Sequence, residues 1–256
     1  MTGHKKMAII ADVHGNSWAL EAVLEDIQKR NIVDILNLGD IFYGPLNPAK
    51  TYELISKTKM TSISGNVDRY MMEVTLDKIQ KPTIPLSNPT MSFVIQSFDD
   101  EGLRWIRKLP KTLTIDDSFF LCHGNLIADD FPLIEKITPN AVLLKTDDEL
   151  TKETRKVNQP IILCGHTHTP RFVNLSNGKK IINPGSVGFP AYTHDFPFEH
   201  KMESCSPHAK YCVIETDNDL LSVQQISLKY DWDSAINQAK KNDRADWAEW
   251  LKSGKA

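Results

Sequence analysis

Histidine and carboxylate side chains follow several apolar runs of this chain, at the points where strands would end. The clearest case is the Gly-His-Thr-His run at 165–168, which comes directly after the apolar run 161–164. The same arrangement recurs before Asp12 and His14, before Asp40 and before His123. Loops at one edge of a sheet bring such side chains together even when they are far apart in sequence. The pattern therefore indicates a metal-dependent enzyme.

Each member of the candidate metal set offers an oxygen or nitrogen ligand: Asp12, His14, Asp40, Asn66, His123, His166 and His168. Mixed imidazole and carboxylate ligands suit Mn, Fe, Ni, Co or Zn better than Ca or Mg. The set is too large for one tetrahedral ion and fits two divalent or trivalent transition-metal ions that share a carboxylate. Two ions ~3.5–4 Å apart clamp the attacking and leaving oxygens of a displacement at phosphorus. A hydroxide bridging them is a nucleophile at neutral pH.

The elements that must position these residues alternate between strand and helix. Apolar runs predict strands at 5–11, 33–38 and 60–64, and amphipathic patterns predict helices at 17–30 and 49–56. Asn16 or Ser17 can cap the first helix. This alternation is typical of a doubly wound α/β fold.

The whole chain, residues 1–256, is predicted to form a single domain. Helices are expected at 90–97, 99–108, 147–157, 231–241 and 243–252, and strands at 111–115, 118–122, 160–164 and within 171–227. Hairpin turns are indicated at Asp116-Asp117, Asn177-Gly178 and Asp217-Asn218. We expect 67–90, 125–150 and 189–209 to be cap or insertion segments, the last as a long loop.

Composition narrows the class of protein. Of the 256 residues 41% are hydrophobic and 25% charged, as in a globular protein, and a net charge of −3 argues against nucleic-acid binding. No apolar run reaches the roughly 18 residues of a membrane span, and the N-terminus lacks a secretory pattern. The four cysteines lack paired spacing, which favours a reducing compartment. We expect a cytoplasmic protein that does not bind a membrane. The sequence does not indicate its oligomeric state.

The ordered motifs Asp12-x-His14, Gly39-Asp40, Gly65-Asn66, His123-Gly124 and Gly165-His166-Thr167-His168 resemble those of the calcineurin-like metallophosphoesterases. The spacing of the motifs also resembles that of the family, with 28 positions from Asp12 to Asp40 and 26 from Asp40 to Asn66. Tyr43-Gly44-Pro45 is similar to the small bacterial and archaeal phosphodiesterase branch. The resemblance covers residues 12–168, and the run 183–187 resembles the next strand-end turn of the family.

The resemblance implies a two-sheet α/β sandwich flanked by helices, with a dinuclear metal site at the C-terminal ends of the strands. It also implies roles for the ligand set. Asp12, His14 and His168 would hold one ion, Asn66, His123 and His166 the other, and Asp40 would bridge them. Asn66 and His123 would help to stabilise the transition state as a metal-bridging hydroxide attacks phosphorus.

The chain departs from the family at Val67. Many relatives have a histidine there, which binds phosphate or protonates the leaving group, and valine can do neither. Asp68, Tyr192 and His194 are candidate replacements, and Arg171 is a candidate phosphate contact. We expect phosphodiester or phosphoanhydride substrates, whose leaving groups need less protonation. Small phosphorylated molecules such as dinucleoside polyphosphates or cyclic nucleotides are the candidate partners.

Aromatic residues of the C-terminal half have two interpretations. Phe189, Tyr192, Phe196 and Phe198 could stack on a nucleobase or anchor their segment to the core. Trp247 and Trp250 have helical spacing, which is typical of a packed stripe or an oligomer contact.

Other functions compete with phosphodiester hydrolysis. A phosphomonoesterase or protein phosphatase of the same fold would share the ligand set. A non-catalytic scaffold would keep the fold and act by binding partners, although this chain retains every ligand position. Amidohydrolases and β-lactamase-like hydrolases are disfavoured, because their paired histidines have another order in the chain.

Overall fold

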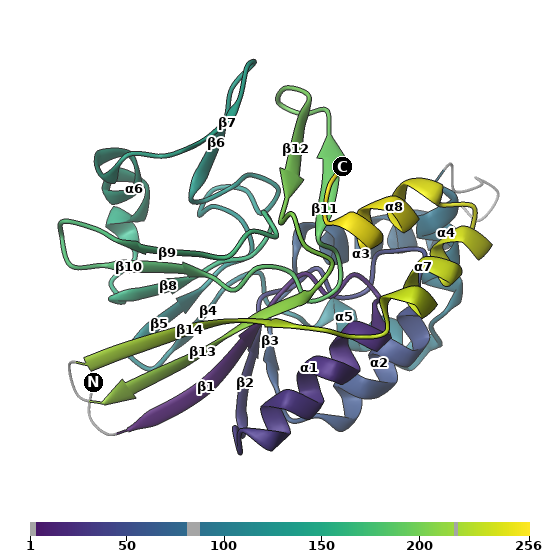
Figure 1. Cartoon of the computed structure of the whole chain (residues 1–256), viewed down its shortest axis with the longest axis horizontal. Coiled ribbons are helices and arrows are strands. Elements are labelled where there is room, and N and C mark those ends of the chain that lie inside the picture. The colour runs from purple at the N-terminus through teal and green to yellow at the C-terminus, as the bar shows by residue number, and fades with distance from the viewer. Residues whose placement is uncertain (1–3, 81–87, 218–219) are drawn as a thin grey trace.

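Two five-stranded sheets form the centre of the computed structural model, which describes residues 4–80, 88–217 and 220–256 (Figure 1). The first sheet has the strand order β14-β13-β1-β2-β3 and the second β4-β5-β8-β10-β9. Helices lie outside the sheets (Figure 1). This is the two-sheet α/β sandwich that the family resemblance implies.

Parallel pairing gives each sheet one edge at which several strands end. The first sheet contains β1 (Lys5–Ile10), β2 (Asp34–Asn37), β3 (Thr61–Ser62), β13 (Ala209–Asp217) and β14 (Leu220–Leu228). The second contains β4 (Leu113–Ile115), β5 (Phe119–Leu121), β8 (Ile161–Leu163), β9 (Arg171–Asn174) and β10 (Lys180–Asn183). Strands β1, β2 and β3 run parallel, as do β5, β8 and β10. Their C-terminal ends carry the ligand-type residues.

Most helices lie where the periodicity places them. They are α1 (Ser17–Lys29), α2 (Pro48–Lys57), α3 (Asn66–Gln80), α4 (Pro89–Gln96), α5 (Asp100–Arg107), α6 (Asp147–Glu153), the 3₁₀ turn η1 (Thr154–Lys156), α7 (Trp232–Lys241) and α8 (Ala245–Ser253). The side chain of Asn16 caps α1 by accepting a hydrogen bond from the Ala19 N–H at 3.1 Å. Such a cap supplies a partner to an N–H that the helix leaves unpaired.

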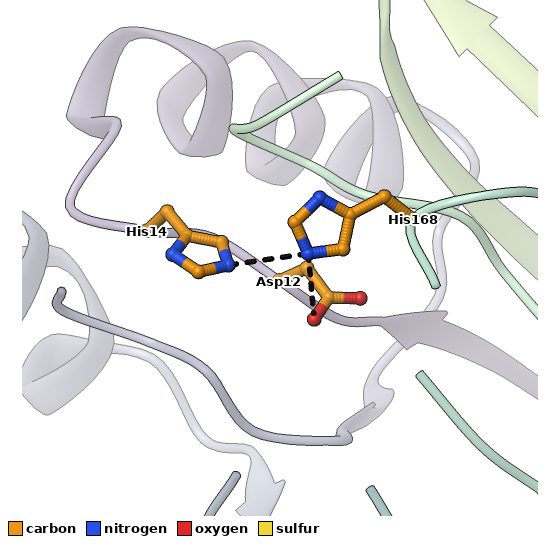
Figure 2. A group of neighbouring side chains, drawn as sticks. All are labelled: Asp12, His14 and His168. Carbon is orange, nitrogen blue, oxygen red and sulfur yellow. Dashed lines mark hydrogen bonds and ion pairs between the residues drawn. The ribbon is translucent and has the colours of Figure 1, made fainter. Parts of the chain in front are cut away.

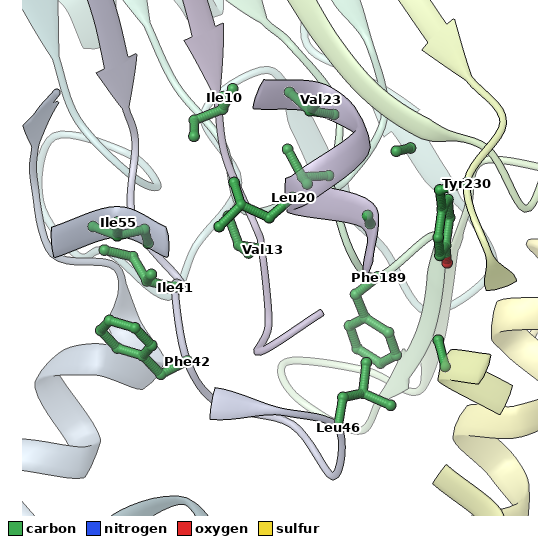
Figure 3. Close-up of a cluster of buried hydrophobic side chains, with 14 of the residues drawn as sticks. Ile10, Val13, Leu20, Val23, Ile41, Phe42, Leu46, Ile55, Phe189 and Tyr230 are labelled. Atoms are coloured by element: carbon green, nitrogen blue, oxygen red, sulfur yellow. The ribbon is translucent and has the colours of Figure 1, made fainter. Parts of the chain in front are cut away.

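The core explains why the strands are apolar without alternation. Ala8 and Ile10 of β1 belong to the cluster beneath the helices, whereas Met7 and Ile9 pack against the second sheet. Figure 3 shows the first cluster, which includes side chains of β1 and α1 together with Phe189 from the C-terminal half. A strand covered on both faces is apolar at every position.

Two hairpins occupy segments in which the sequence predicts no strands. β6 (Glu135–Ile137) pairs with β7 (Val142–Leu144), and β11 (Ala191–His194) pairs with β12 (His200–Glu203). The long loop predicted at 189–209 is therefore wrong. Within the described residues, each of these four strands pairs only with its hairpin partner. None of them therefore has the apolar pattern of a buried strand. Both hairpins project from the body of the molecule, and β11–β12 lies beside α8 (Figure 1).

The other predicted turns and segments have mixed outcomes. The hairpins β4–β5 and β9–β10 form at the predicted turns. Strands β13 and β14 also pair, up to Asp217 and Leu220, but residue 218 of the predicted turn lies outside the described residues. Helix α3 occupies much of 67–90, of which 81–87 are also outside the described part. No helix within the described residues is long and apolar enough to span a membrane.

Candidate metal centre

The ligand-type residues lie in loops whose backbone is left-handed. The angle φ is between 50° and 70° at Asp12, His14, Asp40, His166 and His168. This region is uncommon for residues with side chains, although Asp and His enter it more often than most. It recurs at functional sites, where the surrounding structure enforces it. Here it turns the side chains inward just after the strands end.

Asp12, His14 and His168 form one compact group. Each offers a ligand atom within 4.8 Å of the others, and all three are buried. Nε2 of His168 lies 3.4 Å from Asp12 Oδ1 and 3.3 Å from His14 Nε2. Figure 2 shows the side chains converging from two segments that are 154 positions apart. The group offers one oxygen and two nitrogens to a cation.

Asp40, His123 and His166 form a second group of the same kind. Nε2 of His123 lies 3.2 Å from Asp40 Oδ2, and the rings of His123 and His166 are 5.4 Å apart. Asn66 adjoins this group, with its Oδ1 3.2 Å from His166 Nδ1. The structure thus brings all seven candidate ligands together in two neighbouring groups, the second of which includes Asp40.

Asp40 lies between the groups. Its Oδ2 is 3.8 Å from His14 Nε2 of the first group and 3.2 Å from His123 Nε2 of the second. Its Oδ1 accepts the backbone N–H of Val67 at 3.0 Å, which fixes the carboxylate plane. A carboxylate held in this position can bridge two ions.

Backbone carbonyl groups orient three of the imidazole rings. Nδ1 of each contacts a backbone carbonyl and donates to it, which leaves Nε2 as the acceptor that faces the centre. The acceptors are the carbonyl oxygens of Tyr43 for His14 (2.8 Å), Leu38 for His123 (2.8 Å) and Phe189 for His168 (2.6 Å). This is how histidine ligands are held in metal proteins.

The electrostatics of the centre call for a cation. Burial disfavours protonation of His123, but the carboxylates of Asp40 and Asp12 outweigh it and raise the pKa of His123 to about 10. Burial and nearby His168 lower the pKa of His14 to about 4, so that ring is neutral and able to ligate. Among the described residues, Asp12 Oδ2 and His123 Nε2 are buried without a hydrogen-bond partner. Buried polar atoms without partners are costly, and metal ions would satisfy them.

A cavity of about 360 Å³ opens onto the centre. Ligand-type residues form one side of it: His14, Asp40, Asn66, His166 and His168. Aromatic side chains form much of the rest: Tyr43, Phe189, Tyr192, Phe196, Trp247 and Trp250. Its size and partly apolar lining are those of a small-molecule site.

Tyr192 and His194, two of the candidate substrate contacts, line this cavity. The Tyr192 hydroxyl donates to the His166 carbonyl at 3.0 Å, and its ring lies 4.7 Å from that of His168. Tyr192 therefore packs directly on the ligand loop. Burial raises the pKa of its phenol well above the usual value.

Asp68 and Arg171, the other two candidates, do not line the cavity. The Asp68 carboxylate is buried behind the ligand loops, where it accepts the N–H groups of Ile41 and Gly65, each at 3.0 Å. Burial and the charge of Asp40 raise the pKa of Asp68 to about 7. Asp68 thus ties the loop after β2 to the start of α3.

Arg171 forms an ion pair on the far side of the ligand loops. Its Nε lies 3.2 Å from Oε1 of the buried Glu135, which comes from β6. This contact fastens the β6–β7 hairpin to the second sheet. The pair engages Nε of the guanidinium.

The cavity also contains residues that the sequence does not identify. Asp130, His200, Arg244, Asp246 and the two tryptophans of α8 line it. Trp247 is buried and stacks on Phe189, with ring centroids 3.7 Å apart. The packed stripe predicted on this helix is present, and the same side chains reach the cavity. No local signal marks the two tryptophans as cavity residues, because the packing of α8 against β11 places them there.

Comparisons with known proteins agree with the fold and the ligand pattern. A model of the calcineurin-like phosphoesterase superfamily domain matches residues 6–219. The chain is 28% identical over 263 residues to uncharacterized protein MJ0912 of Methanocaldococcus jannaschii, covering 94% of each chain. Its fold is similar to a metallophosphoesterase from Sphaerobacter thermophilus, with a TM-score of 0.72, 23% identity, and coverage of 98% of this chain and 99% of that one. The matched domain ends before α7 and α8.

Proposed function

Because the chain belongs to the calcineurin-like phosphoesterase superfamily, we propose that it hydrolyses small phosphodiesters or phosphoanhydrides with two metal ions. The position of Asp40 carries this proposal. One carboxylate oxygen lies within 4 Å of an imidazole from each group, at 3.8 and 3.2 Å. Asp12, His14 and His168 would hold one ion, Asn66, His123 and His166 the other, and Asp40 would contact both. Mn, Fe, Ni, Co and Zn suit such ligands.

Metal ions bound here would supply an activated water at neutral pH and polarise the phosphoryl oxygens. The residues of the chain then position the substrate and stabilise charge. Asn66 lines the cavity, and with its Oδ1 on the side of His166 its amide N–H₂ can donate to a phosphoryl oxygen. Fixed donors of this kind act on charge that develops in the transition state.

The lining of the cavity favours substrates with a substituent on phosphorus. Val67 presents an apolar side chain next to Asn66, and a proton donor is therefore absent from that position. The aromatic side chains that line the cavity offer faces and edges to an aryl group or a nucleobase. A nucleotide diester or a dinucleoside polyphosphate fits both features better than an alkyl phosphomonoester does.

A hydrolysis panel on metal-stripped protein tests the proposal. Mn, Ni, Co, Zn, Fe and Mg are restored one at a time, with bis-p-nitrophenyl phosphate, p-nitrophenyl phosphate and diadenosine tetraphosphate as substrates. We expect a transition metal to restore cleavage of the diester and the anhydride, and Asp40→Ala to lower it at least about 10²-fold. His208→Gln is a matched control, because this histidine bonds Ser206 and does not line the cavity.

The other outcomes separate the alternatives. Preference for p-nitrophenyl phosphate would keep the phosphoesterase class and remove the diester preference. Well-folded protein that shows no turnover with any metal would contradict the proposal and favour a non-catalytic binding protein.

A further inference from the structure

We propose that His194 and His200, paired across the β11–β12 hairpin, protonate the leaving group of the substrate. The inference rests on the proposed phosphoesterase function and identifies the residues that complete it. Departure of an alkoxide or phenolate from phosphorus is slow unless a positioned acid supplies a proton. Esters with poor leaving groups are therefore cleaved quickly here only if the cavity contains a proton donor that is not already a metal ligand.

The hairpin aims both histidines at the cavity. Tyr192 and His194 are two positions apart on β11, so their side chains leave the same face of the strand. Tyr192 faces the centre, because its hydroxyl donates to the His166 carbonyl. His200 is the cross-strand partner of His194, and the two rings lie 5.7 Å apart. Both side chains line the same cavity as the ligand groups.

The backbone of the hairpin orients both rings. Nδ1 of His194 lies 3.0 Å from the backbone N and the carbonyl O of Phe196. Nδ1 of His200 lies 2.7 Å from the carbonyl of Phe198. Nδ1 is thus engaged by the local chain in each ring. Among the described residues Nε2 of neither ring has a hydrogen-bond partner, so this nitrogen is available to substrate.

Several other polar groups of the cavity are committed elsewhere. The ligand imidazoles direct Nε2 to the metal centre or, for His166, pair with Asn66. The Tyr192 hydroxyl is committed to a carbonyl. Arg244 is held by Asp246 at 2.7 Å, and a guanidinium does not release its proton. Imidazole is the side chain that holds and releases a proton near neutral pH.

The proposed step conserves atoms and charge. As the bond between phosphorus and the leaving oxygen breaks, one imidazolium of the pair transfers its Nε2 proton to that oxygen. The alcohol or phenol departs, the phosphoryl group keeps the oxygen of the attacking water, and the imidazole takes back a proton released by that water. The second ring lies close enough to exchange the proton through solvent.

Dependence on the leaving group tests this role. Aryl methyl phosphodiesters that differ only in the phenol, from p-nitrophenyl to unsubstituted phenyl, are compared in wild type and in the His194→Gln, His200→Gln double variant. We expect kcat/KM for the phenyl ester to fall about 10²–10⁴-fold. The p-nitrophenyl ester, whose leaving group needs no proton, should change by less than about threefold.

Controls separate this role from structural effects. His208→Gln should leave both substrates unchanged, and the bound metal content should equal that of wild type in every variant. Equal losses for both esters, or no loss for the phenyl ester, would overturn the inference while leaving the phosphoesterase intact. If wild type with metal does not cleave even the p-nitrophenyl ester, the proposed function itself fails.

Discussion

Single residues of the centre are held in conformations that only their surroundings can maintain. Five of the seven ligand-type side chains have positive φ, and several contacts that fix them are made by backbone atoms. Such conformations cost of order 1–3 kcal/mol each. Changes in the backbone beside the ligands should therefore disturb metal binding without removing any ligand atom.

Gly65 gives a direct test of this sensitivity. A Cβ at this position would lie 2.0 Å from Asp40 Oδ1 and 2.4 Å from the Asp40 backbone nitrogen. Gly65→Ala must therefore displace the bridging carboxylate. We expect a loss of about 1–3 kcal/mol in unfolding free energy from overpacking and at least about a 10²-fold loss of activity. Urea unfolding, metal content and hydrolysis measure the two effects.

Gly178→Ala is the matched control for this change. Gly178 also requires the left-handed conformation, with φ of 86°, but a Cβ there meets nothing within 4 Å. It lies at the β9–β10 turn, away from the ligand loops. This variant should lose some stability and keep its metal and activity. Full metal content in Gly65→Ala would show that the Asp40 position is less constrained than the contacts require.

At the scale of elements, the site combines a framework of strand ends with surrounding elements that shape the cavity. Loops at the strand ends of both sheets carry the ligands, whereas the β11–β12 hairpin and α8 supply many of the other residues that line the cavity. Helix α8 lies beyond the family match, which ends at residue 219. The β11–β12 hairpin lies within that match. We assign substrate preference to this hairpin and α8, and metal chemistry to the strand-end framework.

Trp250 on α8 tests that division. Its half-buried ring lies 5.7 Å from Phe189 and lines the cavity. Stacking of a base on an aromatic ring is worth about 1–3 kcal/mol. In Trp250→Ala, KM for thymidine 5′-p-nitrophenyl phosphate should rise about 5- to 100-fold. KM for methyl p-nitrophenyl phosphate, which has the same leaving group and no base, should change little.

Trp232→Ala on α7 is the control for loss of an exposed tryptophan face. That ring packs against Tyr230 and His208 and does not line the cavity. It should leave both KM values unchanged. If Trp250→Ala affects the two substrates equally, α8 does not recognise the base.

The sequence predicts the strand-end framework well and the positions of the β11–β12 hairpin and α8 poorly, for a physical reason. An apolar run followed by Asp12 or His123 is a local signal, and parallel strands align such ends automatically. The position of Trp250 depends on how α8 packs on β11, about 60 residues away along the chain. The position of His200 is equally difficult to predict, because β12 forms no part of a buried sheet. The sequence also gives no sign of the contacts that Asp68 makes with the Ile41 N–H and Arg171 makes with Glu135.

At the scale of the whole molecule, the metal centre joins the two sheets. Four of the ligand-type residues follow strands of the first sheet: Asp12, His14, Asp40 and Asn66. The other three follow β5 and β8 of the second sheet: His123, His166 and His168. Without cations, buried Asp12 and Asp40 must be neutralised by protons on histidine instead. Bound ions would both balance these charges and link the sheets at one edge.

Metal removal should therefore lower thermal stability as well as activity. A ligand that binds only the folded state adds about 2.7 kcal/mol at one hundred times its Kd. For a chain of this size about 1 kcal/mol shifts Tm by roughly 2–4 °C, so the activating metal should raise Tm by about 5–10 °C over chelated protein. Calorimetry at increasing metal concentration measures this shift. Asp40→Ala should respond less to the metal, since one carboxylate that contacts both groups is gone, whereas His208→Gln should respond like wild type. A Tm independent of metal in wild type would mean that the two sheets hold the ligands in place unaided and that the ions contribute chemistry alone.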